Sequence, residues 1–413
     1  MNQHRPRLRP LDIRPFVQDG QELLFLRDPL ALADRSVVIP AAAAPILALC
    51  DGTRDADEIR TALLAHFGLR VAREGLDGLL TALDQTCLLE NERTAAARAR
   101  ALDDFRAAPF RAPALAGAAY PAEPAALAAQ LDAYMDTARA RYPSGRALPA
   151  ANARGLVSPH IDYERGGPVY AAVWDQAKPA ALAADLAIIF GTDHSGGHGR
   201  LTLTRQHYAT PYGVLPTPAA IVDACAAAVS APFEEELHHR SEHSIELAAV
   251  WLHHVRAGRP CEVVPVLCGS FGHFVAGQAD PAADRDIAGL VAALHAASVG
   301  RRVLVVAAAD MAHIGPAFGG DPVDAAAAAA LRAADAALLE RMAAGDAAGF
   351  FAELAGVGDR NNVCGLPPIY LALRLLAASD GASSAGGVPC AYDQCPADSD
   401  LTSFVSVAGL VWP

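Results

Sequence analysis

Residues 186–194 read Leu-Ala-Ile-Ile-Phe-Gly-Thr-Asp-His, an apolar run that ends in a turn, an aspartate and a histidine. An unbroken apolar run of this length is typical of a strand covered on both faces. Other apolar runs alternate with Ala-rich segments that predict helices, and they lie at residues 155–158, 262–267, 302–306 and 405–410. We therefore expect residues 110–413 to form an α/β domain with a mostly parallel central sheet flanked by helices.

Histidines follow three of these runs. His160 comes after the run at 155–158, His194 after the run at 186–191, and His313 after the run at 302–306. The second and third of these histidines have an aspartate nearby, Asp193 and Asp310. Because α/β sheets bind ligands beyond the carboxyl ends of their strands, these five side chains are expected to meet in one cleft.

Two more segments fit this cleft. Residues 241–246 read Ser-Glu-His-Ser-Ile-Glu and open a predicted helix, with Ser241 as the expected N-cap. Cys364 lies in a polar loop just before a Pro-started helix, whose positive end favours a thiolate. On local context alone, Cys364 could instead be an inert buried thiol, and Glu242 could simply serve the helix dipole.

Residues 1–95 are predicted to form a separate, small α+β module of winged-helix type. Strands are expected at 22–26 and 36–40, helices at 41–50, 55–67 and 73–86, and a closing strand at 87–90. Residues 96–109, rich in charge and alanine, are expected to be a linker.

The first module carries the motifs Leu-Cys-Asp-Gly-Thr-Arg at 49–54, Glu-Ile at 58–59, Phe-Gly at 67–68 and Leu-Leu-Glu at 88–90. In these motifs it resembles the PqqD-like family, also called RiPP recognition elements. The resemblance implies docking of a precursor peptide or protein substrate by strand addition along a free sheet edge. A structural or regulatory winged helix is the alternative, and DNA binding is disfavoured because Glu74 and Asp77 lie on the would-be recognition helix.

Composition excludes several classes of protein. Among 413 residues, 33 Lys and Arg face 46 Asp and Glu, and the net charge of −13 repels nucleic acid. No apolar stretch is long enough for a membrane helix, and the Arg- and Pro-containing N-terminus lacks the apolar core of a secretory signal. The eight cysteines form no CxxC pair, which argues against a zinc ribbon or a disulfide framework. We expect a cytoplasmic protein with no membrane or nucleic-acid partner.

The larger region carries eight ordered motifs, at residues 116–120, 159–163, 191–194, 208–213, 242–246, 265–269, 310–315 and 364–365. In these it resembles the Memo family, which has the LigB-type fold of class III extradiol dioxygenases. The resemblance implies a metal site at His160, His194 and Cys364. It also implies catalytic roles for Asp310, His313, Glu242 and His243, with His313 oriented by Asp310. Outer contacts or substrate-pocket roles fall on Asp162, Tyr163, Asp193, Tyr212 and Glu246.

LigB-type dioxygenases hold Fe(II) with two histidines and a carboxylate, and here a cysteine takes the carboxylate's place. A thiolate donates more electron density, so the expected divalent metal is Fe(II) or copper, with zinc also allowed. The motifs depart from the usual Memo pattern at Leu115 and Ala119, at Ile161 and Asp162, and at residues 195–198, which affects the substrate more than the metal.

The expected function is a metal-dependent oxidoreductase that acts on a peptide or protein recruited by the first module. The alternatives are a non-catalytic peptide-binding adaptor with a vestigial pocket, and a metal-dependent hydrolase with Glu242 or Asp310 as base. The neighbouring pairs His238-His239 and His253-His254 are expected to be solvated, because adjacent residues on a helix point about 100° apart and do not converge.

Overall fold

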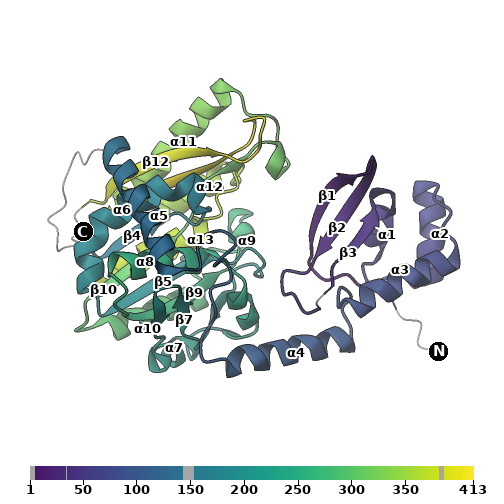
Figure 1. Cartoon of the computed structure of the whole chain (residues 1–413), viewed down its shortest axis with the longest axis horizontal. Coiled ribbons are helices and arrows are strands. Elements are labelled where there is room, and N and C mark those ends of the chain that lie inside the picture. The colour runs from purple at the N-terminus through teal and green to yellow at the C-terminus, as the bar shows by residue number, and fades with distance from the viewer. Residues whose placement is uncertain (1–4, 34, 143–152, 381–385) are drawn as a thin grey trace. The chain divides into compact units, whose positions relative to one another are not determined.

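The structure is a computed structural model that describes residues 5–33, 35–142, 153–380 and 386–413. The chain divides into two compact units, Met1–Ala108 and Pro109–Pro413, each with its own core (Figure 1). Most of the predicted linker, residues 96–109, lies in helix α4 (Glu92–Ala107). The side chain of Asn91 caps this helix by accepting from the N–H of Thr94.

Unit 1 is a three-stranded antiparallel sheet followed by helices. The sheet has the order β1-β2-β3, from β1 (Asp12–Gln18), β2 (Gln21–Arg27) and β3 (Val37–Pro40). The helices are α1 (Ala44–Leu49), α2 (Ala56–Phe67) and α3 (Arg73–Gln85), which confirms the three predicted helices. Strand β1 was not predicted. The strand expected at residues 87–90 is wrong, because among those residues only Leu89 makes an isolated bridge, to Leu8.

Helix α2 begins and ends as its sequence predicts. The Asp55 side chain accepts from the N–H groups of Asp57 and Glu58, and the Glu58 carboxylate accepts from the N–H of Asp55. This capping box satisfies backbone donors that have no partner inside the helix. Gly68 ends the helix in the left-handed conformation, with φ of 66°, which costs glycine little.

Unit 2 is built on an eight-stranded sheet with the order β11-β13-β4-β10-β5-β9-β6, and β12 pairs with β13. Its four central strands run parallel, and the outer strands pair antiparallel. Every predicted run is a strand. The strands are β4 (Gly155–Ser158), β5 (Leu186–Thr192), β6 (Leu201–Leu203), β9 (Glu262–Cys268), β10 (Val303–Ala308), β11 (His313–Ile314), β12 (Val388–Pro396) and β13 (Phe404–Trp412).

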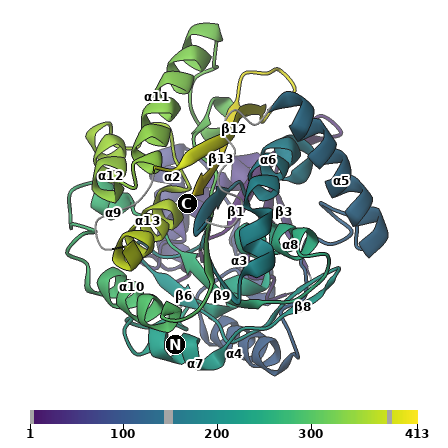
Figure 2. The same ribbon diagram turned by 90° about the vertical axis from the view of Figure 1, so that its left-hand side faces the viewer.

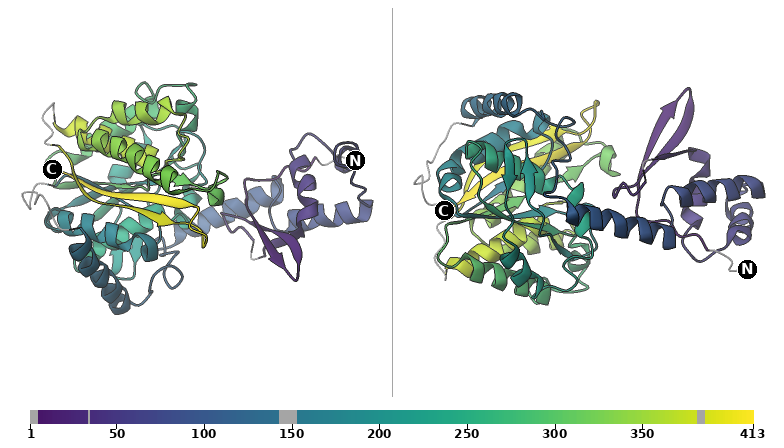
Figure 3. Two further views of the ribbon diagram at one scale, coloured as in Figure 1. Left: turned by 90° about the horizontal axis from the view of Figure 1, so that it is seen from above. Right: turned by 60° about the horizontal axis from the view of Figure 1, so that its bottom comes forward.

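Helices cover both faces of this sheet, as the apolar strands require (Figure 2). One face packs against α5 (Pro124–Arg141), α6 (Tyr163–Ala183) and α8 (Ser244–Val255). The other packs against α7 (Ala219–Ala226), α10 (Arg285–Ser298), α11 (Ala325–Ala343), α12 (Ala347–Gly356) and α13 (Leu366–Asp380). Figure 3 shows the yellow β12–β13 hairpin between the blue and the green helices.

Short elements complete unit 2. The hairpin of β7 (Tyr208–Thr210) and β8 (Gly213–Leu215) is a separate two-stranded sheet, and α9 (Gly272–Val275) is a single turn. Two 3-10 turns, η2 (Glu236–Arg240) and η3 (Pro316–Phe318), lie in the loops. Among the described residues, no helix has the length and apolar character that crossing a membrane requires.

All three tryptophans lie in unit 2 and are buried there. Trp174 on α6 donates from Nε1 to Ser158 Oγ at 3.0 Å, and Trp412 on β13 donates to the carbonyl of Met342 at 2.7 Å. Trp251 on α8 stacks on Tyr170 with ring centroids 5.9 Å apart. These rings fix both helix layers to the sheet.

Candidate metal centre

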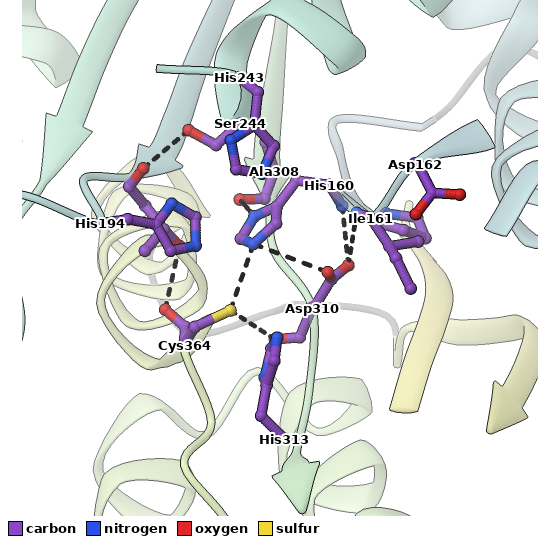
Figure 4. A network of polar contacts seen from close by, with 12 residues as sticks. His160, Ile161, Asp162, His194, His243, Ser244, Ala308, Asp310, His313 and Cys364 are labelled. Carbon is purple, nitrogen blue, oxygen red and sulfur yellow. Dashed lines mark hydrogen bonds and ion pairs between the residues drawn. The ribbon is translucent and has the colours of Figure 1, made fainter. Parts of the chain in front are cut away.

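Three neighbouring parallel strands deliver the candidate ligands to one edge of the sheet. Strand β10 lies between β4 and β5. His160 follows the end of β4, His194 follows β5, and Asp310 follows β10. The predicted convergence of these residues is thus present in the fold (Figure 4).

His160 is almost fully buried and is held from three sides. Its Nδ1 lies 3.0 Å from the carbonyl of Ala308, and its backbone N–H donates to Asp310 Oδ1 at 2.8 Å. Its Nε2 lies 3.2 Å from Cys364 Sγ and 3.7 Å from Asp310 Oδ2. The ring is therefore fixed with Nε2 directed toward the cleft.

Glu242 holds the other two imidazoles. Its buried carboxylate lies 3.1 Å from His194 Nδ1 and 3.0 Å from His243 Nδ1. It also accepts from the N–H groups of His194, His243 and Ser244 at 3.1, 2.7 and 3.1 Å. The N-cap residue of helix α8 is His243, not Ser241 as expected, and its side chain makes no cap hydrogen bond. The Glu242 carboxylate instead accepts from the backbone N–H groups at the start of this helix.

His160, His194 and His243 form one cluster, the three-imidazole cluster. Their rings are 4.9 to 5.5 Å apart by centroid, and one nitrogen of each lies within 4.8 Å of the others. Each Nδ1 faces an acceptor, either the Ala308 carbonyl or the Glu242 carboxylate. A proton held on Nδ1 leaves the lone pair of Nε2 for a metal, the arrangement usual for metal-binding histidines.

Cys364 lies beside this cluster, in the loop before α13. The Thr192 hydroxyl donates to its carbonyl at 3.0 Å and ties the loop to strand β5. Burial raises the pKa of the thiol, but the positive charge of His160, hydrogen bonds from His160 and His194, and the charge of His313 outweigh it and lower the pKa to about 5. Cys364 is therefore a thiolate at neutral pH.

The imidazoles carry the compensating charge in the metal-free protein. Burial lowers the pKa of His160, but Asp310 and Cys364 outweigh it and raise the pKa to about 9. For His194, burial lowers the pKa and the Glu242 charge raises it well above its usual value. Burial raises the pKa of Glu242, yet His194 and His243 hold it well below its usual value. A bound metal would displace the Nε2 protons.

His313 is oriented differently from the prediction. The Asp310 carboxylate contacts His160 and Ile161, so it does not orient His313. The Nδ1 of His313 instead lies 3.3 Å from the carbonyl of Asn362. Figure 4 shows His313 and His160 on either side of the Cys364 sulfur. His313 keeps its predicted place near the thiolate.

Other predicted pocket residues have partners outside the cluster. The Tyr163 hydroxyl donates to the carbonyl of Leu247 in the core, and Tyr212 contacts His254. Asp162 caps α6 and pairs with Arg165. Buried Glu246 binds Arg111, Tyr120 and two backbone N–H groups, so it fastens the start of unit 2 to α8. Asp193 points to His238, with Oδ2 and Nδ1 2.8 Å apart.

The expectation that the paired histidines are solvated is wrong. The side chains of His238 and His254 are only 12% and 11% exposed, and His239 and His253 are buried. Each has a polar partner: Asp193 for His238, Tyr208 for His239, Thr210 for His253 and Asp132 for His254. The two histidines of each pair thus reach different polar groups inside the protein.

Comparison with known proteins agrees with this architecture. The profile of the Memo-like protein family matches residues 111–411, which is nearly all of unit 2. A MEMO1 family protein of Aquifex aeolicus is 24% identical over 323 residues, 77% of this chain and 78% of that protein. A MEMO1 family protein of Thermus thermophilus is 28% identical over 297 residues, 71% of this chain and 82% of its own length.

A third relative is more similar over a shorter stretch. A MEMO1 family protein of Desulfurococcus amylolyticus is 30% identical over 219 residues, which cover 50% of this chain and 70% of the relative. The family match includes β4, β5, β10 and the loop of Cys364, the segments that form the cluster. Through residues 111–411, the chain belongs to the Memo family.

Proposed function

We propose that unit 2 is a metal-dependent oxidoreductase that holds a divalent iron or copper ion among His160, His194, Cys364 and His243. The observation that carries the proposal is that the Nδ1 of each of the three imidazoles faces an acceptor, while the Nε2 of His160 lies 3.2 Å from the Cys364 sulfur.

The donor set fits such an ion. Imidazole nitrogen and thiolate sulfur suit iron, copper and zinc, whereas Mg²⁺ and Ca²⁺ prefer oxygen ligands. Two ligands bonded at about 2.0 and 2.3 Å are roughly 3.0 Å apart at an angle of 90° and roughly 3.5 Å apart at 109°. The 3.2 Å between His160 Nε2 and Cys364 Sγ lies between these values. Little movement would bring both atoms onto one ion.

The residues around the cluster have distinct roles in this proposal. A bound iron or copper ion would supply one-electron chemistry, and the thiolate would tune its potential. Glu242 fixes two imidazoles at once. His313, next to the sulfur but outside the three-imidazole cluster, is free to give or take a proton from a substrate, with Asn362 holding its Nδ1.

Metal content tests the ligand assignment, and oxygen consumption by the iron- or copper-loaded protein tests the redox chemistry. Protein purified without oxygen should contain about one iron or copper ion per chain by mass spectrometry, and His160→Ala, His194→Ala and Cys364→Ser should each lose most of it. The matched control is His295→Ala on α10, whose Nδ1 lies 3.4 Å from Ser379 Oγ and which is not part of the cluster, so this variant should keep the metal. Equal retention in all four variants would overturn the ligand assignment.

Hydrolysis is the competing chemistry. Glu242 is poorly suited to act as its base, because hydrogen bonds already occupy both of its carboxylate oxygens. Activity that survives with zinc and does not depend on oxygen would favour hydrolysis. Peptide binding that survives both chelation and Cys364→Ser, with no turnover, would favour an adaptor.

A peptide or protein substrate, recruited by unit 1, is the second part of the proposal. Strand β3 is an edge of its sheet, and Val38 on this strand is 48% exposed. A free edge offers backbone groups to an added strand, and α3 packs beside it to supply apolar contacts.

A further inference from the structure

A second group of side chains of the types that bind metals lies next to the first. It comprises Asp193, Glu235 and His238, and it is separate from the three-imidazole cluster. One ligand atom from each of the three lies within 4.8 Å of the others. The Asp193 side chain is only 1% exposed, and its Oδ2 lies 2.8 Å from His238 Nδ1.

The spacing matches that of neighbouring ligands on one ion. Two ligands at 90°, each bonded at about 2.05 Å, are roughly 2.9 Å apart, and opposite ligands are about 4.1 Å apart. The Asp193–His238 pair meets the first value, and the Glu235 ligand atom lies within 4.8 Å of both partners, less than 1 Å beyond the second value. A small rotation of the partly exposed Glu235 would therefore complete the set.

Two glycines let the loop backbone approach both carboxylates closely. A Cβ on Gly196 would come within 2.7 Å of Asp193 Oδ2, and a Cβ on Gly197 within 3.2 Å of Glu235 Oε1. The N–H of Gly197 donates to both Glu235 oxygens, at 3.1 and 3.2 Å. Side chains at positions 196 and 197 would therefore crowd the two carboxylates, and glycine at both positions avoids this.

We propose that Asp193, Glu235 and His238 form an accessory site for a divalent transition-metal ion. One imidazole and two carboxylates suit an ion such as Zn²⁺ or Mn²⁺, and they lack the thiolate of the first site. The ion at this second site is additional to the one in the proposed function and does not depend on it.

The accessory site is joined to the first site at two points. Asp193 is bonded to His194 through the chain, and the N–H of Glu242 donates to the carbonyl of His238 at 3.0 Å. An ion among Asp193, Glu235 and His238 would link the β5 loop to the turn that carries Glu242. It would act as a brace for the residues that orient His194 and His243.

Cobalt binding to the full-length, metal-stripped protein tests the proposal. Co²⁺ beside Cys364 gives a thiolate-to-cobalt absorption band, whereas Co²⁺ bound only by nitrogen and oxygen does not. Glu235→Gln and His238→Ala should each remove one bound ion, or lower the affinity for that ion by at least about 10- to 100-fold, while the thiolate band remains. Glu234→Gln is the matched control, because that neighbouring carboxylate pairs with Arg200 instead.

The outcomes separate the two sites. Loss of one ion in Glu235→Gln, with the thiolate band intact or absent from the start, supports the accessory site whether or not the first site binds metal. Equal ion number and affinity in Glu235→Gln and Glu234→Gln would overturn it and leave Asp193 and His238 as a structural ion pair. If His238→Ala fails to fold, the partly exposed Glu235→Gln decides alone.

Discussion

The Glu242 carboxylate contacts the imidazoles of both His194 and His243, so one substitution at this position should disturb the orientation of both rings. Glu242→Gln keeps the shape but removes the charge and can accept through only one oxygen. We expect metal affinity to fall about 10- to 100-fold, as when an outer partner of a ligating histidine is lost. Competition with a metal-binding dye measures this, with exposed Glu340→Gln on α11 as control. An unchanged affinity would mean that other contacts orient the two rings.

Cys364 should show its lowered pKa in its reactivity. A pKa of about 5 is below the usual value of about 8.5, so the thiolate persists as the pH falls from 9 to 6 and is lost only as it falls through 5. In metal-stripped protein, alkylation of Cys364 by iodoacetamide should be nearly constant above pH 6. Mass spectrometry of the labelled peptide gives the rate at each pH. A rate that still climbs through pH 8.5 would contradict the prediction.

The other cysteines give an internal comparison. Burial raises the pKa of Cys225 and Cys390 to about 12, so their labelling should remain slow across the same pH range. Cys364→Ser should therefore abolish the fast reaction in the native protein.

At the scale of single residues, the sequence predicted the positions that follow strands. His160, His194 and Asp310 could be found because a run of apolar residues ends just before each. Partners supplied by irregular turns could not be found in this way. The role of His243 beside His194 depends on how Glu242 folds back, and the burial of His238 depends on a turn that brings it to Asp193.

Helix α2 allows the value of its capping box to be measured. Asp55→Ala removes an acceptor used by two backbone N–H groups, so the free energy of unfolding of unit 1 should fall by about 1 kcal/mol. Urea denaturation followed by far-UV circular dichroism measures this change. Asp55→Ser should recover most of the loss, because serine caps nearly as well. A loss of equal size in both variants would point to charge and not to capping.

Strand β3 can be tested for peptide docking through Val38. Val38→Lys puts a charge on an exposed position, so it should leave the fold intact and weaken a peptide that adds to this edge by roughly tenfold, about 1.4 kcal/mol. Fluorescence anisotropy with labelled candidate peptides gives the affinity. Val17→Lys on β1, the opposite edge, is the matched control. Weakening by Val17→Lys alone would move the docking edge to β1.

At the scale of elements, the large unit was predictable and the small unit only in part. Strands such as β5 and β9 are apolar throughout because both faces are covered, and such runs are plain in a sequence. Strand β1 is mostly exposed and contains Arg14 and Pro15, so it has neither an apolar run nor a clean alternation. The apolar pair Leu88-Leu89 suggested a strand, but these side chains fill the core from an irregular segment. The winged-helix assignment stays a prediction.

The two units should separate by deletion. Removing residues 1–108 should leave a folded unit 2 that retains its metal, since its core lies wholly within residues 109–413. If unit 1 recruits the peptide, KM should rise while kcat changes little, the pattern of lost uniform binding. Steady-state kinetics of the truncated and full-length proteins provide the comparison. An unchanged KM would reject recruitment, and precipitation would indicate a structural role for unit 1.

The placement of the tryptophans gives the protein a built-in optical separation. Unit 1 contains neither tryptophan nor tyrosine, whereas Trp174, Trp251 and Trp412 all lie in the core of unit 2. Intrinsic fluorescence therefore reports on unit 2 alone, without any label. Trp174 donates a hydrogen bond to Ser158, which lies two residues before His160. Its emission should therefore change when a quenching metal ion enters or leaves the site. Unfolding of unit 1 changes no tryptophan or tyrosine of its own, so it can be followed separately by far-UV circular dichroism.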